Sequence, residues 1–185
     1  AILFGGASSE HSISCATASG VLSAIDRNKY EVLAIGITRD GVFVPAIDDA
    51  KHWALTEGEL PEVKFAGEIV IWPAAGTKEF FVERDGKKSS LGEVDVVFPV
   101  LHGPKGEDGT IQGLLEMADI AYVGSGVLAS AVAMDKSFAK PIFAAHGIKV
   151  AAGFVARTSD WVKDKSGIQK QADLLGYPVF VKPAR

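Results

Sequence analysis

Short apolar runs that end at glycine or polar residues divide the first third of the chain. Ile2-Leu3-Phe4 runs into Gly5-Gly6, which predicts a first strand that ends in a tight turn. Residues 30–38 are apolar on both faces, which is typical of a strand buried in a parallel sheet. A helical segment separates these two strands, so the pattern predicts a βαβ unit and an α/β fold.

The helical segment after the first turn has apolar residues at helical spacing. Ser8 or Ser9 can cap its amino end, because a serine hydroxyl accepts hydrogen bonds from the unpaired N–H groups there. The residues expected to share one face of this helix are Ile13, Ala16, Gly20, Val21, Ala24 and Ile25.

Residues 39–92 change to short runs between turn signals. Asp40-Gly41 and Asp85-Gly86 are typical of β-hairpin turns, and the runs 42–44, 68–72 and 79–83 suit antiparallel strands. We therefore expect a hairpin-rich insertion at the edge of the βαβ domain, after which residues 94–101 return to the central sheet.

The second part of the chain reads mainly as helix. Residues 127–145 are helical in pattern, and Pro141 predicts a break or a second helix start. A helix is also expected over residues 159–175, with strands over 149–156 and 179–182. The glycines around residues 124–126 place a domain boundary between 1–125 and 126–185. Both chain ends look cut, so we expect the folded unit to continue past Arg185.

Composition and charge narrow the functional classes. The formal net charge of −4 argues against a nucleic-acid surface, which needs clustered Lys and Arg. No apolar run approaches the roughly 20 residues of a membrane span. Cys15 is the single cysteine, so no internal disulfide can form. These features favour a soluble cytoplasmic protein without nucleic-acid or membrane partners.

Glu10 is the first candidate for chemistry. The turn Gly5-Gly6-Ala7-Ser8-Ser9-Glu10 lies where a Rossmann protein holds a pyrophosphate, but it lacks the third glycine of that pattern. A carboxylate at a helix start would repel a phosphate and would suit an ammonium, such as the amino group of an amino acid. The alternative interpretation is that Glu10 only complements the helix dipole.

His102 ends an apolar run and opens a loop with Gly103, Gly106 and Gly109. Ligands of open α/β sheets bind beyond the carboxyl ends of the strands, where this loop would lie. The position favours a functional histidine over a structural one that only hydrogen-bonds the glycine loop.

Two lysines are candidates for contact with an anion. Lys182 lies in an apolar run, where an ammonium without a partner is costly to bury, and a polyphosphate would compensate it. It can equally extend to solvent. Lys136 carries the same two interpretations. The sequence has no P-loop, no histidine spacing typical of a metal site and no carboxylate cluster suited to magnesium.

Five segments in order resemble the D-alanine–D-alanine ligase family of ATP-grasp enzymes. They are Phe4-Gly5-Gly6-Ala7-Ser8-Ser9-Glu10-His11-Ser12-Ile13-Ser14, Leu101-His102-Gly103-Pro104-Lys105-Gly106-Glu107-Asp108-Gly109-Thr110-Ile111-Gln112-Gly113, Tyr122-Val123-Gly124-Ser125-Gly126-Val127-Leu128-Ala129-Ser130-Ala131, Met134-Asp135-Lys136 and Val181-Lys182-Pro183-Ala184-Arg185. The resemblance implies an N-terminal Rossmann-like βαβ (pre-ATP-grasp) domain with a hairpin-rich insertion, followed by the start of an ATP-grasp domain.

The resemblance also implies an activity, the ATP-dependent joining of two D-alanines through an acylphosphate for peptidoglycan precursor synthesis. Glu10 would hold the ammonium of the first D-alanine and His102 would lie beside that substrate. Lys136 and Lys182 would contact ATP phosphates, and the ligands of Mg²⁺ or Mn²⁺ would lie beyond residue 185. The enzyme would be a cytoplasmic homodimer, and the chain alone would be inactive.

Two alternatives remain at this point. Residues that select the second substrate would lie beyond Arg185, so a D-alanine–D-hydroxy-acid (depsipeptide) ligase of the same family is the first alternative. A non-catalytic amino-acid-binding domain on the same scaffold is the alternative from a different class.

Overall fold

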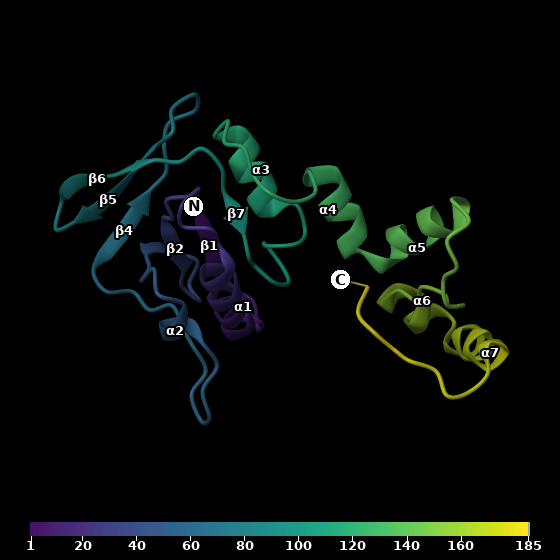
Figure 1. Ribbon diagram of the computed structural model, residues 1–185. Coiled ribbons are helices and arrows are strands. Elements are labelled where there is room, and N and C mark those ends of the chain that lie inside the picture. Colours follow the sequence, from purple (N-terminus) through teal and green to yellow (C-terminus); the bar gives the residue numbers. More distant parts are fainter. Residues whose placement is uncertain (185) are drawn as a thin grey trace. The chain divides into compact units, whose positions relative to one another are not determined.

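The computed structural model describes residues 1–184 (Figure 1). The chain forms two compact units, Ala1–Ala131 and Val132–Arg185, here called unit 1 and unit 2. Helix α4 (Val127–Met134) contains the division between them. The boundary expected from the sequence, between residues 125 and 126, lies just before this helix and stays a prediction.

A four-stranded sheet forms the centre of unit 1. Its order is β3 (Phe43–Pro45), β2 (Ala34–Ile37), β1 (Ile2–Gly5) and β7 (Phe98–Pro99). Strand β1 pairs in parallel with both β2 and β7, whereas β3 pairs antiparallel with β2. The predicted parallel core is therefore confirmed, and its carboxyl ends meet at one edge.

One face of this sheet packs on two helices, α1 (His11–Ala24) and α2 (Ala50–Trp53). Successive side chains of a strand point to opposite faces, so Ile2 and Phe4 lie together on this side. The ring of Phe4 meets Trp53 edge to face, with centroids 4.7 Å apart. Helix α2 was not expected from the sequence.

The other face of the sheet packs on helix α3 (Thr110–Met117) and on a second sheet. Leu3 of β1 and Phe80 of the second sheet are both fully buried in this cluster. The second sheet is antiparallel, in the order β4 (Glu68–Ile71), β5 (Glu79–Arg84) and β6 (Lys87–Glu93). This sheet confirms the predicted hairpin-rich insertion.

Helix α1 is present, but of its predicted apolar face Val21 and Ile25 pack against the core, whereas other members do not. Ile13 is 48% exposed, and the buried residues are His11, Ser12, Ser14, Cys15, Ala18 and Leu22. Small side chains on this face suit a short distance between helix and sheet. Neither predicted serine is the cap, because Glu10 occupies the cap position and no side chain caps the helix. Polar side chains therefore face the sheet here, and an apolar periodicity could not predict that.

Unit 2 contains α5 (Lys136–Ala145), α6 (Thr158–Lys163) and α7 (Lys165–Leu175) in addition to the end of α4. The break predicted at Pro141 is wrong: α5 runs through Pro141. The chain breaks at Asp135, whose carboxylate caps α5 by accepting from the Ser137 N–H at 2.8 Å. Asp164 similarly divides the single helix expected over residues 159–175, because its carboxylate caps α7.

The strands predicted over residues 149–156 and 179–182 are wrong, since neither segment is a strand. A strand needs a neighbour that pairs with its N–H and C=O groups, and within residues 132–184 no strand offers one. Phe180 and Val181 are 87% and 94% exposed.

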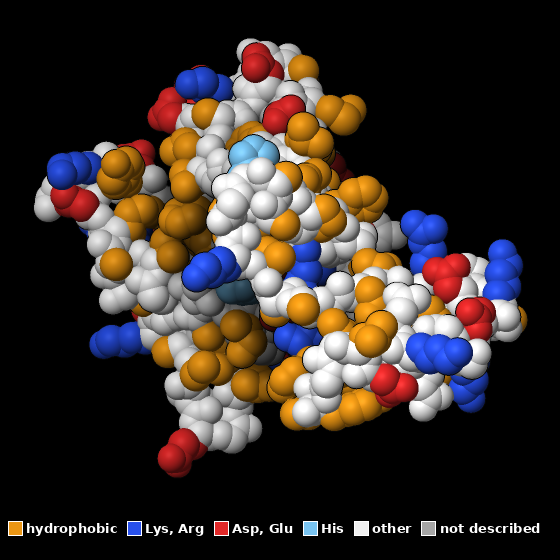
Figure 2. All heavy atoms as spheres, turned by 90° about the vertical axis from the view of Figure 1, so that its right-hand side faces the viewer, with side chains coloured by type: hydrophobic (Ala, Val, Ile, Leu, Met, Phe, Trp, Pro, Cys, Tyr) orange, Lys and Arg blue, Asp and Glu red, His pale blue; other side chains and the backbone are white. Residues whose placement is uncertain are grey.

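Figure 2 looks onto the right-hand side of Figure 1 and shows apolar side chains among charged ones over the surface. No helix of residues 1–184 is both long and apolar enough to cross a lipid bilayer.

Candidate functional site

The turn after β1 needs glycine at both of its positions. Gly5 and Gly6 have φ values of +92° and +94°, a region that other residues rarely adopt. A Cβ at Gly5 would lie 2.4 Å from the backbone oxygen of Ile37, so a side chain cannot fit. The turn directs the chain from the carboxyl end of β1 straight into α1.

The side chain of His11 holds this turn in place through hydrogen bonds of both ring nitrogens. Its imidazole is fully buried, with Nδ1 2.7 Å from the Gly6 oxygen, and Nε2 accepts from the Val63 N–H at 2.9 Å. Since Val63 donates to Nε2, the proton of the neutral ring lies on Nδ1 and is donated to Gly6. His11 is thus a structural histidine, and its partner Val63 lies too far along the chain for local sequence reasoning to find.

The Glu10 carboxylate lies against the loop that follows β7. A Cβ at Gly103 would lie 2.8 Å from Glu10 Oε2, so the carboxylate reaches a space that only glycine leaves open. Within residues 1–184 this carboxylate makes no hydrogen bond to the start of its helix and no ion pair. It is exposed and therefore available to a ligand.

Ser8 joins the two loops that carry the candidate residues. Its buried Oγ accepts from the Glu10 N–H at 3.0 Å and donates to the His102 oxygen at 2.8 Å. Glu10 and His102 are 92 positions apart in the sequence but neighbours at the carboxyl edge of the sheet, as the sequence predicted. Their functional roles stay predictions.

Helix α1 also holds the strand end that leads to His102. Ser14, which is fully buried, accepts from the Gly5 N–H at 2.8 Å and donates to the Val100 oxygen at 2.5 Å. The half-buried imidazole of His102 has Nε2 3.1 Å from the hydroxyl oxygen of Thr17. The sequence did not single out Thr17 or Ser14, since both are small polar residues on a helix.

Two carboxylates of the glycine loop, those of Glu107 and Asp108, accept hydrogen bonds from backbone N–H groups of the loop and of the first residue of α3. Glu107 accepts from the Gly103 N–H at 2.7 Å. Asp108 accepts from the N–H groups of Lys105 and Thr110, the second of which begins α3. Burial of the Asp108 carboxyl raises its pKa, but these hydrogen bonds outweigh burial and leave the pKa below its usual value. Both carboxylates therefore serve the loop.

The two candidate lysines lie in unit 2, on segments that touch. Lys136 begins α5, and its backbone N–H donates to the oxygen of Ala184 at 2.9 Å. Lys182 is exposed, and its Nζ lies 6.0 Å from the ring centroid of Phe180. Of the two interpretations of Lys182, burial on a strand is wrong and extension to solvent is confirmed, because within residues 132–184 no strand pairs with its segment. Contact of either lysine with phosphate stays a prediction.

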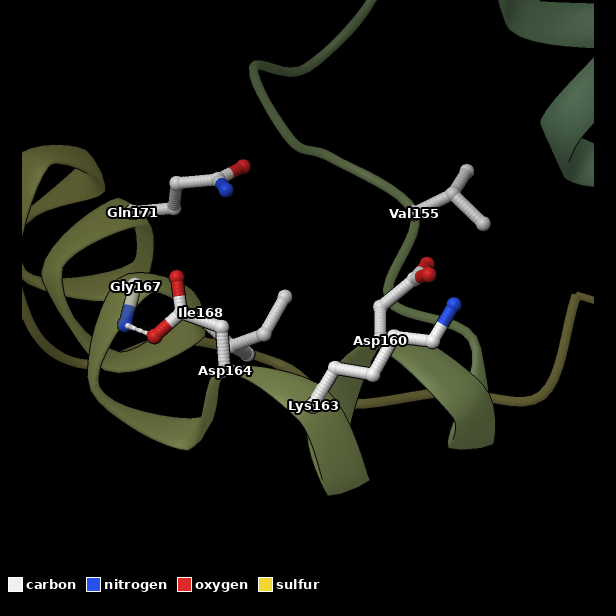
Figure 3. Close-up of a pocket in the computed structure, with 7 residues that line it drawn as sticks. All are labelled: Val155, Asp160, Lys163, Asp164, Gly167, Ile168 and Gln171. Carbon is white, nitrogen blue, oxygen red and sulfur yellow. Dashed lines mark hydrogen bonds between the residues drawn. The ribbon is translucent and has the colours of Figure 1, made fainter.

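A shallow pocket of about 280 Å³ lies between α6 and α7 in unit 2 (Figure 3). Its lining residues are Val155, Asp160, Lys163, Asp164, Gly167, Ile168 and Gln171. The Asp164 carboxylate already accepts from the Gly167 N–H at 2.8 Å. Neither candidate lysine lines this pocket, and residues 1–184 contain no group of three or more His, Cys, Asp or Glu side chains that could hold a metal ion.

Comparison with known sequences gives a consistent result. A family model described as "D-ala D-ala ligase N-terminus" matches residues 1–125. The D-alanine–D-alanine ligase of Paenarthrobacter aurescens is 52% identical over the whole chain, and that of Streptomyces coelicolor is 49% identical. The chain spans about half the length of these curated relatives, 50% of each.

Comparison with solved structures also finds ligases of this kind. The VanG D-Ala:D-Ser ligase of Enterococcus faecalis matches the whole chain and 51% of its own, with a TM-score of 0.74 and 32% identity. The D-alanine–D-alanine ligase of Coxiella burnetii matches 95% of this chain and 49% of its own, with a TM-score of 0.69 and 29% identity. The βαβ core, the glycine turn and these matches together show that the chain belongs to the D-alanine–D-alanine ligase family.

Proposed function

We propose that this chain supplies the first-substrate site and part of the nucleotide site of an ATP-dependent ligase that joins two D-alanines for peptidoglycan precursors. The observation that carries the proposal is the Glu10 carboxylate, which lies against Gly103 beside His102 and is not used to cap its own helix. An uncommitted carboxylate at the carboxyl edge of a parallel sheet suits the ammonium of an amino acid.

We propose that Glu10 binds the ammonium group of the first D-alanine and that His102 lies beside it. An ammonium has three N–H donors and no acceptor, so it needs several oxygen or nitrogen acceptors around it. The carboxylate of Glu10 supplies two oxygens, and a neutral imidazole supplies one lone pair. This set would orient the substrate without affinity for a phosphate.

We propose that Lys136 and Lys182 contact the phosphates of ATP. Their segments touch through the hydrogen bond from Lys136 N–H to Ala184, and Lys182 is exposed. Two positive charges fit a polyphosphate. From the resemblance to the ligase family, we propose that Mg²⁺ or Mn²⁺ acts with ATP and that its ligands lie beyond residue 185.

In the proposed reaction, the carboxylate of the first D-alanine attacks the γ-phosphorus of ATP, which gives an acylphosphate and ADP. The amine of the second D-alanine then attacks the acyl carbon, forms the peptide bond and expels inorganic phosphate. Residues of unit 1 would hold the first substrate during both steps, and the lysines would stabilise charge on the transferred phosphoryl group.

The test is phosphate release by the complete gene product that contains this chain. We expect release that needs both ATP and D-alanine, and none from residues 1–185 alone, which lack the proposed metal ligands. ATP- and D-alanine-dependent release by the 185-residue chain, or none by the complete protein, would contradict the proposal. A homodimer in the cytoplasm is proposed from the resemblance alone, and sedimentation of the complete protein would test its oligomeric state.

A ligase with a different second substrate is the second candidate. The structural match to a D-Ala:D-Ser ligase, which covers this whole chain, favours testing it. Mass spectrometry of the products formed from D-alanine with D-serine or D-lactate separates the candidates. We expect D-alanyl-D-alanine as the main product, because relatives that are 49–52% identical to this chain are D-alanine–D-alanine ligases.

A further inference from the structure

The hydroxyl of Thr17 lies against the ring of His102 across the contact between α1 and the glycine loop. Thr17 Oγ1 is 3.1 Å from His102 Nε2, and the same hydroxyl donates to the Ile13 oxygen at 2.9 Å. Thr17 is one helical turn beyond Ile13 on α1, whereas His102 is 85 positions away.

The position of the hydroxyl proton assigns the protonated nitrogen of His102. A threonine hydroxyl has one proton to donate and two lone pairs that accept. Its proton is directed to Ile13, so Oγ1 can only accept from the imidazole. Nε2 of the neutral ring then carries the hydrogen, and Nδ1 carries the lone pair.

The backbone of His102 is held independently of its ring. Ser8 binds the His102 oxygen at 2.8 Å, and Ser14 binds the oxygen of Val100 at 2.5 Å. Two torsions of the side chain remain, and the bond to Thr17 restrains them both. A backbone fixed in this way means that loss of the Thr17 hydroxyl would alter the ring and leave the loop in place.

We propose that Thr17 is a positioning residue that fixes the orientation and the Nε2–H tautomer of His102, leaving Nδ1 as a hydrogen-bond acceptor for the substrate. The inference rests on the proposed function, because it is the ammonium bound at Glu10 that would use such an acceptor. The opposite tautomer would present an N–H to an ammonium, which has no lone pair to accept it.

The tautomer is measured directly by ¹⁵N NMR of the histidine rings in the complete protein, with signals assigned through His102→Gln. In the wild type we expect the Nε2 signal of a protonated nitrogen and the Nδ1 signal of an unprotonated one. Thr17→Ser, which keeps the hydroxyl, should preserve this pattern. Thr17→Val, which keeps the shape, should give a mixture of tautomers. A wild-type ring with Nδ1–H, or an unchanged pattern in Thr17→Val, would overturn the proposal.

Kinetics of the same variants test the consequence. We expect Thr17→Val to lower kcat/KM for the first D-alanine about tenfold, the scale of one hydrogen bond, while KM for ATP is unchanged and Thr17→Ser restores the rate. Equal losses in Thr17→Ser and Thr17→Val would assign Thr17 a packing role and overturn the inference. If His102→Gln itself has no effect, the role of His102 in the proposed function fails, and positioning by Thr17 fails with it.

Discussion

The two units of the chain differ most in what they bury. Unit 1 covers both faces of its sheet, with Phe4 and Trp53 on one side and Leu3 and Phe80 on the other. Within the described part of unit 2, Ala139 is the only buried apolar residue. An apolar run therefore forms a strand where neighbouring strands bind its backbone N–H and C=O groups and a second layer buries its side chains. Apolar side chains alone do not provide these partners.

The same contrast separates the two sets of candidate residues. The backbones of Glu10 and His102 are both bound by the buried hydroxyl of Ser8, and Ser14 binds the strand end at Val100 that leads to His102. Lys136 and Lys182 lie on exposed segments joined by a backbone hydrogen bond. The positions of Glu10 and His102 in unit 1 are therefore fixed more tightly than those of Lys136 and Lys182 in unit 2.

Removal of a large ring should destabilise unit 1 strongly and unit 2 hardly at all. Phe80 is fully buried and Phe180 is 87% exposed. We expect Phe80→Ala to lower the free energy of unfolding of unit 1 by about 4 kcal/mol through lost burial and a cavity. Phe180→Ala should change the free energy of unfolding of unit 2 by less than about 0.5 kcal/mol. Urea unfolding of the 185-residue chain, followed by fluorescence of single-tryptophan variants that keep Trp72 in unit 1 or Trp161 in unit 2, measures the two effects, and equal losses would contradict the assigned cores.

Histidine replacements should show a similar difference. His11→Ala leaves the Gly6 oxygen and the Val63 N–H without partners in a buried place, so we expect a loss of about 3 kcal/mol in unfolding free energy. His146→Ala removes an exposed ring at the end of α5 and serves as the control, with a change below about 1 kcal/mol. A loss for His11→Ala no larger than for His146→Ala would remove the structural role of His11.

The buried thiol of Cys15 predicts a dependence on alkaline pH. Burial raises its pKa from 9.0 to about 11. Below pH 9 the thiol is protonated in both states. Between pH 9 and about 11 the unfolded chain loses the proton and the folded chain keeps it, so stability falls as pH rises, by about 2 kcal/mol in all. The unfolding free energy of Cys15→Ala should lack this part of the decline, and parallel curves would contradict it.

Gly103 and Gly147 have nearly equal φ values, so a comparison of their alanine variants separates the cost of backbone strain from the cost of a side-chain contact. Gly103 has φ of +73° and Gly147 has φ of +75°, but only a Cβ at Gly103 would meet the Glu10 carboxylate. We expect both alanine variants to lose about 1 kcal/mol of stability. Only Gly103→Ala should also raise KM for D-alanine in the complete protein, about tenfold. Equal KM values in the two variants would show that the carboxylate position is unimportant.

Local sequence patterns predicted much of unit 1. Asp85 and Gly86 have φ values of +50° and +72°, as the hairpin signal requires, and Arg84 pairs with Lys87 across the turn. The positive φ values of Gly5 and Gly6 likewise agree with the predicted tight turn. The rule for parallel strand ends placed the His102 loop at the carboxyl edge of the sheet, whereas a shared substrate for Glu10 and His102 was implied only by the resemblance to the ligase family.

The remaining features depend on contacts between distant residues. The bond of His11 to Val63 and that of Thr17 to His102 join segments that no local pattern links. The buried face of α1 was missed because its residues are small or polar, and apolar spacing pointed to Ile13. In unit 2, apolar runs predicted strands, but the described residues supply no strand to pair with them.

The most direct test of the division of roles between the two units compares Glu10→Gln with Lys182→Met in the complete protein by steady-state kinetics. Loss of a charge-assisted hydrogen bond predicts that Glu10→Gln raises KM for the first D-alanine roughly 10- to 100-fold and changes KM for ATP less than about twofold. Lys182→Met should show the reverse. If Glu10→Gln weakens ATP and leaves D-alanine unchanged, the assignment of the ammonium site to unit 1 is wrong.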